Sequence, residues 1–130
     1  WLVFREPELP KLFALCEKRL VVGYNVRGFD LPVLANYGLK QEKLDVFDLM
    51  FDIELITRQR FVKLDSVAQG TLGVGKSADG LMAIEWWRSG QEQKVIDYCL
   101  QDVKVTRDVF EYGRREGRIF IQRAENQKQE

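Results

Sequence analysis

The alternation of short apolar runs with helical stretches constrains the fold of this chain more than any other feature of its sequence. The run LVVGY at residues 20–24 is apolar, β-branched and followed by a turn, which predicts a buried strand. Helices are predicted on either side of it, over residues 6–19 and 29–37, and a second short strand is predicted over residues 44–47. Strands separated by helices predict an α/β layer fold with a parallel component.

The remainder of the chain is predicted to be helical up to residues 118–122, where RIFIQ alternates like an edge strand. Asp48 is placed to cap the helix that follows the second strand. We expect a single domain over residues 1–124, followed by a polar tail over residues 125–130.

Composition excludes several classes of chemistry. The chain has no histidine, which rules out Ser-His-Asp and Cys-His catalysis and histidine-based zinc sites. Lys and Arg number 20, as do Asp and Glu, so a nucleic-acid site would have to be a local basic patch. Cys16 and Cys99 form no C-x-x-C motif, which suggests reduced thiols in a cytoplasmic protein. With no long apolar segment and no signal peptide, we expect neither a membrane span nor secretion.

The segment GTLGVGKS, from Gly70 to Ser77, matches the G-x-x-x-x-G-K-[ST] pattern of a nucleotide-binding phosphate loop. Such a loop requires a buried strand directly before its first glycine. The apolar residues before Gly70 instead recur at helical spacing, so Gly70 is predicted inside a helix that ends at Gly73. We therefore interpret the segment as a connection between two helices, with Lys76 as a solvated loop cation and no nucleoside triphosphate bound.

An acidic residue lies in the apolar stripe of the long helix predicted after Gly90. Asp102 falls on the apolar side of this helix, and Tyr98 lies one turn away on the same face. Burying an unpaired carboxylate costs several kcal/mol, so Asp102 requires a cation, hydrogen bonds or a metal ion. A cap or a salt bridge to an arginine such as Arg27 would satisfy it without any ligand. The whole stripe consists of Val95, Tyr98, Cys99, Asp102, Val103, Thr106, Val109 and Phe110.

Asp30 lies where α/β folds present ligand-binding residues. It follows the strand at residues 20–24 through a turn and stands at the start of the next helix. An acid in a first helical turn also interacts favourably with the helix dipole, and this alternative requires no ligand.

Together the segments around Asp30 and Asp102 resemble motifs of one nuclease family. The pattern N-x-x-x-F-D-x-P-x-L, from Asn25 to Leu34, is similar to the second exonuclease motif of the DEDD 3′–5′ exonucleases, which have an RNase H-like fold. Tyr98-x-x-x-Asp102 resembles the third motif of the tyrosine-bearing branch, DEDDy, related to the proofreading domains of family B DNA polymerases. The resemblance covers about residues 1–122 and implies an RNase H-like mixed sheet flanked by helices.

The first motif of that family, Asp-x-Glu on an opening strand, does not precede the second motif in this sequence. Asp52-Ile53-Glu54 spells it but follows the second motif and falls in a predicted helix, so we interpret it as a chance match. We therefore expect an RNase H-like domain that is truncated at its N-terminus, lacks its first strands and is inactive by itself.

The resemblance implies two-metal hydrolysis of phosphodiester bonds, with Mg2+ or Mn2+ held by carboxylates. Asp30 and Asp102 would be metal ligands, and Tyr98 would orient the attacking water. Asn25 would contact the substrate, and Phe29 would pack either against a terminal base or in the core. A phosphate-contacting patch and a solvated charged face are the alternatives for Arg58, Arg60, Lys63 and Lys76.

The implied substrate is the 3′ end of single-stranded DNA or RNA, and an attached helicase or polymerase domain is compatible with the resemblance. The alternative from another class is a non-catalytic nucleic-acid-binding or scaffolding module with the same fold. In the nuclease, Asp30 and Asp102 should converge at one end of the central sheet, with Tyr98 lining the same cleft.

Our first prediction concerns the phosphate-loop pattern. Because the residues before Gly70 are predicted to be helical, we expect no ATP or GTP binding that depends on Lys76. Titration of the chain and of Lys76→Ala with a fluorescent nucleotide would test this. Micromolar affinity that disappears in Lys76→Ala would show that the segment is a true phosphate loop.

Overall fold

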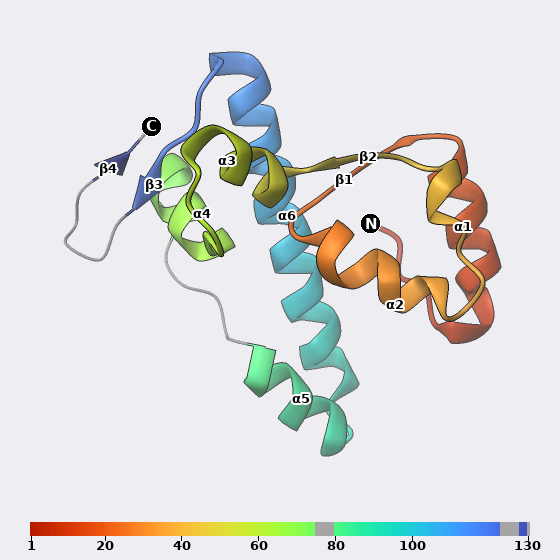
Figure 1. Cartoon of the computed structure of the whole chain (residues 1–130). Coiled ribbons are helices and arrows are strands. Elements are labelled where there is room, and N and C mark those ends of the chain that lie inside the picture. The colour runs from red at the N-terminus through yellow and green to blue at the C-terminus, as the bar shows by residue number, and fades with distance from the viewer. Residues whose placement is uncertain (75–79, 123–127, 130) are drawn as a thin grey trace. The chain divides into compact units, whose positions relative to one another are not determined.

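The structure is a computed structural model that describes residues 1–74, 80–122 and 128–129. Its fold is mixed α/β, mostly helical with little sheet, as the sequence predicts at that level. The chain forms two compact units, Trp1–Val62 and Lys63–Glu130, whose elements are labelled in Figure 1. The single domain expected over residues 1–124 stays a prediction.

The first unit is built around two parallel strands, β1 and β2. They pair in register, with Leu20 opposite Asp45 and Gly23 opposite Asp48. Both strands were predicted, but β1 is buried only at Gly23, and Leu20 is 56% exposed. The helix predicted over residues 29–37 is also present, although it begins earlier, with a wide π turn, and ends at Ala35. In chain order the elements are a 3-10 turn Glu6–Glu8, α1 Leu9–Glu17, β1 Leu20–Gly23, the π turn Val26–Asp30, α2 Leu31–Ala35, a 3-10 turn Gln41–Lys43, β2 Asp45–Asp48 and α3 Leu49–Thr57.

The start of α3 confirms the predicted cap. The Asp48 carboxylate accepts hydrogen bonds from the Met50 N–H at 3.1 Å and the Phe51 N–H at 3.4 Å. These bonds satisfy N–H groups that a helix leaves without partners in its first turn. The Asp52-Ile53-Glu54 sequence lies inside α3, which confirms that its setting is helical rather than extended.

The described residues of the second unit form three helices and two short paired strands. The helix predicted before Gly73 is present, and Gly73 ends it with φ of 71°, a conformation that favours glycine. The long helix predicted after Gly90 is also present. The strand expected over residues 118–122 is limited to its last two residues. The elements are α4 Leu64–Leu72, α5 Gly80–Arg88, α6 Glu92–Glu116, β3 Ile121–Gln122 and β4 Lys128–Gln129, which pairs antiparallel with β3.

α4 approaches β3 so closely that no side chain fits at Gly70. A Cβ on Gly70 would lie 2.6 Å from the Phe120 carbonyl oxygen and 2.7 Å from the Gln122 amide nitrogen. Thr71 joins the same segments, because its hydroxyl donates to the Phe120 carbonyl and accepts from the Phe120 N–H, both at 2.8 Å. Two residues of GTLGVGKS therefore serve to pack a helix against a strand. Lys76 lies outside the described residues.

The buried stripe of α6 differs in part from the predicted one. Thr106 and Val109 are buried as predicted, but Val103 is 54% exposed, Cys99 is exposed, and Val105 is buried instead. Successive residues are rotated by about 100° around a helix. By this rotation Val103 lies at one edge of the predicted stripe, and Val105 lies just beyond the other edge.

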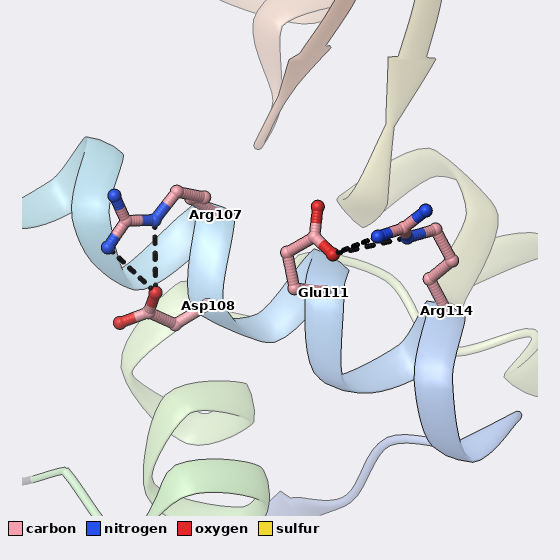
Figure 2. Close-up of polar contacts among 4 residues, drawn as sticks. All are labelled: Arg107, Asp108, Glu111 and Arg114. Atoms are coloured by element: carbon pink, nitrogen blue, oxygen red, sulfur yellow. Dashed lines mark hydrogen bonds and ion pairs between the residues drawn. The ribbon is translucent and has the colours of Figure 1, made fainter.

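The outer face of α6 carries local ion pairs, shown in Figure 2. Arg107 pairs with Asp108 at 3.1 Å, and Arg114 pairs with Glu111 at 2.6 Å. These side chains are largely exposed, so each pair contributes at most about 1 kcal/mol to stability. Within the described residues, no helix combines the length and the hydropathy that a membrane span requires.

The contact at Gly70 generates a second prediction. Gly70→Ala should lower the free energy of unfolding by about 1–3 kcal/mol, because its Cβ would meet backbone atoms that cannot move independently. Gly80→Ala at the start of α5 is the matched control, since no described atom lies within 4 Å of its Cβ. We expect that variant to be neutral or slightly stabilising. Equal stabilities in urea denaturation would contradict the close helix–strand contact.

Candidate functional site

The turn that leads to Asp30 is held by the Asp48 carboxylate. Asp48 is 5% exposed, and it accepts from the Asn25 N–H at 2.8 Å and the Arg27 N–H at 3.0 Å. The Arg27 guanidinium in turn donates to the Val46 carbonyl at 3.0 Å. The residues that follow β1 are thus fixed to the end of β2.

Sequence analysis found the helix cap at Asp48 but missed these two additional bonds. A signal was present, because Asp48 ends a strand that lies parallel to the strand before Asn25. The carboxyl ends of neighbouring parallel strands meet at the same edge of a sheet. A side chain at that position can therefore reach the loop after the neighbouring strand.

Asn25 has a local structural role in this turn. Its φ is 57°, in the left-handed region that asparagine tolerates better than most residues. A Cβ on Gly28 would lie 2.5 Å from the Asn25 side-chain oxygen, so this amide sits directly over Gly28. The predicted substrate contact of Asn25 stays a prediction.

Asp30 and Phe29 both reach solvent at the end of the turn. Phe29 is 65% exposed, so the interpretation of Phe29 as a core residue is wrong, and contact with a base remains open to it. The pKa of the Asp30 carboxyl is raised above its ordinary value, first by burial and second by the nearby charge of Asp48. The Asp30 carboxyl is therefore harder to ionise than that of a fully solvated aspartate, although it reaches solvent.

Tyr98 and Asp102 form a hydrogen-bonded pair on α6. The phenol donates to the Asp102 carboxylate one turn further along the helix, as the predicted spacing requires. Burial raises the pKa of Asp102, the bond from Tyr98 lowers it, and the charge of Asp65 raises it, with a net increase. Arg27 lies in the first unit, so its salt bridge to Asp102 stays a prediction, and within the second unit Asp102 accepts from the Tyr98 phenol.

The same surroundings keep Tyr98 protonated. Burial raises the pKa of its phenol, and the charge of Asp102 and the hydrogen bond to it raise it further, followed by Asp65 and Cys99. A phenol in this state is a hydrogen-bond donor and not a base at neutral pH. Asp65, in the first turn of α4, is a neighbour of the pair that sequence analysis did not identify.

The two candidate carboxylates lie in different units, Asp30 in the first and Asp102 in the second. Their convergence therefore stays a prediction. Among the described residues, no group of three or more His, Cys, Asp or Glu side chains is arranged to hold a metal ion. Asp30 and Asp102 supply hard oxygen donors, which fit Mg2+ or Mn2+ in type, but two carboxylates leave most of a coordination sphere unfilled.

The chain matches the model of a family described as the RNase_H superfamily over residues 6–114. It therefore belongs to the RNase H superfamily, whose members are generally nucleases and typically use divalent metal ions. The mixed α/β structure is consistent with that membership. No curated protein and no solved structure gives a significant match to the chain. Membership confirms the superfamily expected from the motifs, and the DEDDy branch stays a prediction.

The third prediction follows from the raised pKa values of Asp30 and Asp102. Each carboxyl keeps its proton to higher pH in the folded chain than in the unfolded chain. Stability from this source is complete below about pH 4 and is lost as pH rises through the folded pKa. In EDTA, Asp30→Asn and Asp102→Asn should therefore raise the thermal unfolding midpoint near neutral pH, and raise it less in acid.

The matched control for this measurement is Asp97→Asn, because Asp97 is an exposed aspartate on the same helix as Asp102. It should shift the midpoint less than Asp102→Asn does. A lower midpoint for Asp102→Asn at neutral pH would mean that the ionised carboxylate stabilises the fold, and would contradict an uncompensated charge.

Proposed function

We propose that this chain belongs to a metal-dependent 3′–5′ exonuclease that hydrolyses phosphodiester bonds in single-stranded DNA or RNA. The observation that carries the proposal is the Tyr98–Asp102 pair, a phenol and a carboxylate joined across one turn of α6 on its half-buried side. Membership of a superfamily of nucleases supports the class of reaction. The pair and the Asn25–Leu34 segment together support the DEDDy branch, which is the finer part of the proposal.

Asp30 and Asp102 are the proposed ligands of Mg2+ or Mn2+. Both carboxyls have a raised pKa, and a bound cation would offset the cost of ionising them. Bound ions would supply an activated water and stabilise the leaving oxygen. The remaining ligands would come from the Asp-x-Glu motif of the family. In this sequence no such motif precedes the second motif.

Tyr98 is proposed to orient the attacking water rather than to deprotonate it. Its raised pKa keeps the proton on the phenol, where it is donated to Asp102, and the phenol oxygen can still accept a hydrogen bond from the water. Replacing the hydroxyl removes a positioning contact without removing a metal ligand. A moderate loss of rate distinguishes this role from that of the carboxylates.

Asn25, Phe29 and Lys76 are the proposed substrate contacts. The exposed ring of Phe29 lies next to Asp30 in sequence, where it could stack against a terminal base. Lys76 would contact a phosphate. We also propose a cytoplasmic location and an attached helicase or polymerase domain, for which the sequence resemblance is the support.

A non-catalytic nucleic-acid-binding or scaffolding module is the second candidate. It is favoured by the hydrogen bond from the Tyr98 phenol, which gives the Asp102 carboxylate a partner without a metal ion. Such a module would keep the superfamily fold and bind single strands without hydrolysing them. Hydrolysis assays separate the two candidates directly.

The fourth prediction concerns this activity. Because two carboxylates hold a divalent ion weakly, we expect the 130-residue chain alone to hydrolyse neither DNA nor RNA appreciably, even in millimolar Mn2+. A longer chain that includes an upstream Asp-x-Glu strand should degrade labelled single strands from the 3′ end. There, Asp30→Asn and Asp102→Asn should abolish turnover, and Tyr98→Phe should reduce it by about 10²-fold to 10⁴-fold.

The control is Asp97→Asn, which removes a carboxylate from the exposed side of α6 and should leave turnover unchanged. Robust metal-dependent activity that survives Asp102→Asn would place the active site elsewhere. An inactive long chain with intact carboxylates would favour the binding module.

A further inference from the structure

The segment that follows α3 presents an aromatic side chain in an unfavourable backbone conformation. Phe61 has φ of 57°, in the left-handed region, and it is 78% exposed. That conformation is strained for a bulky residue, and an exposed ring gains nothing from burial. Strained residues of this kind persist only where their surroundings hold them, and they concentrate at functional sites.

Three hydrogen bonds hold the backbone around Phe61. The Phe61 N–H donates to the Glu54 carboxylate at 3.1 Å, and the next residue is fixed because the Tyr24 hydroxyl donates to the Val62 carbonyl. Two residues before Phe61, the Gln59 N–H donates to the Thr57 hydroxyl at 3.2 Å. The chain on both sides of the ring is therefore anchored to the first unit.

Two cations accompany the ring. Arg58 and Arg60 are both exposed, and none of the ion pairs among the described residues involves either of them. Glu54, whose backbone carbonyl accepts from the Arg58 N–H, uses its carboxylate to accept from the Phe61 N–H. The short segment thus combines a held aromatic ring with two arginines that form no ion pair within the described part of the chain.

We propose that Phe61 forms a stacking platform for a base of single-stranded nucleic acid, with Arg58 and Arg60 contacting the phosphates beside that base. An exposed aromatic ring next to unpaired arginines is the combination by which proteins bind single strands without sequence preference. The stacking platform rests on the proposed exonuclease function in one respect, which is that the ligand is nucleic acid. It requires neither metal ions nor hydrolysis.

A protein partner is the competing occupant of this surface. Phe51, Leu55 and Ile56 of α3 are also exposed, and apolar residues of this kind are common at protein interfaces. The charge of the segment decides between the two, because Arg58 and Arg60 precede Phe61 by three residues and by one, and their positive charge complements a polyanion. Self-association of the chain through this surface is therefore one of the results that the test can give, and it is not what we propose.

The test is binding of labelled oligothymidylate, oligouridylate and a duplex of equal length, measured by fluorescence anisotropy in EDTA. Phe61→Leu should weaken binding of single strands by about 5-fold to 100-fold, the loss typical of one stacked base, and Phe61→Trp should retain it. Changing both Arg58 and Arg60 to Gln should make the plot of log affinity against log salt concentration less steep, by about 0.7 in slope for each arginine removed. Tyr37→Ala is the matched control, since Tyr37 is an exposed aromatic elsewhere in the same unit.

Phe61→Gly separates loss of binding from loss of folding. Glycine adopts the left-handed conformation without strain, so this variant should unfold at a higher temperature than the original chain and still bind single strands as weakly as Phe61→Leu. Weaker binding by a more stable protein cannot result from unfolding.

Several outcomes would overturn the proposal. These are affinity unchanged in both Phe61→Leu and Phe61→Gly, preference for the duplex, absence of binding by the original chain, or self-association in light scattering that Phe61→Leu abolishes. Because the assay contains EDTA, its result is independent of catalysis. Binding through Phe61 in a protein that never hydrolyses its ligand would support this proposal while contradicting the exonuclease.

Discussion

The carboxylate of Asp48 is the interaction on which the first unit depends. It accepts from N–H groups of Asn25 and Arg27 and from the first turn of α3, so one buried side chain fixes both the turn after β1 and the start of a helix. Buried N–H groups without partners would cost about 1–3 kcal/mol each, so an apolar residue could not replace it. Burial raises the pKa of Asp30, and the negative charge of Asp48 raises it further. The residue that builds the turn therefore also contributes to the electrostatics of a candidate metal ligand.

Three residues make the fold less stable than a simpler residue at the same position would: Asp30, Asp102 and Phe61. Asp30 and Asp102 resist ionisation, since burial raises both pKa values. Phe61 combines a left-handed backbone with an exposed ring. Such costs persist in proteins where function requires them, because a sequence optimised only for stability would remove them. A bound cation would offset the first two costs, and a stacked base would offset the exposure of the third.

The sequence predicted helices and strands more accurately than the burial and contacts of their side chains. The helices at Leu64–Leu72 and Glu92–Glu116 have clear 3.6-residue periodicity, and both were predicted with Gly73 and Gly90 as boundaries. Periodicity gives the direction of a helix face but not how far its partner covers it, which is why Val103 was assigned to the stripe and Val105 was not. Contacts between segments distant in sequence, such as Asp48 with the turn after β1, depend on strand pairing, which local pattern does not specify.

Two motifs in this chain show why spacing alone is a weak guide and spacing with a physical contact is a strong one. GTLGVGKS matches a phosphate loop at every required position, yet Gly70 and Thr71 lie in a helix and pack it against β3. Tyr98-x-x-x-Asp102 specifies only two positions. On a helix, however, that spacing places the two side chains on adjacent turns of one face, and their hydrogen bond follows directly from the geometry. A motif is informative to the extent that its spacing itself produces the contact that the chemistry requires.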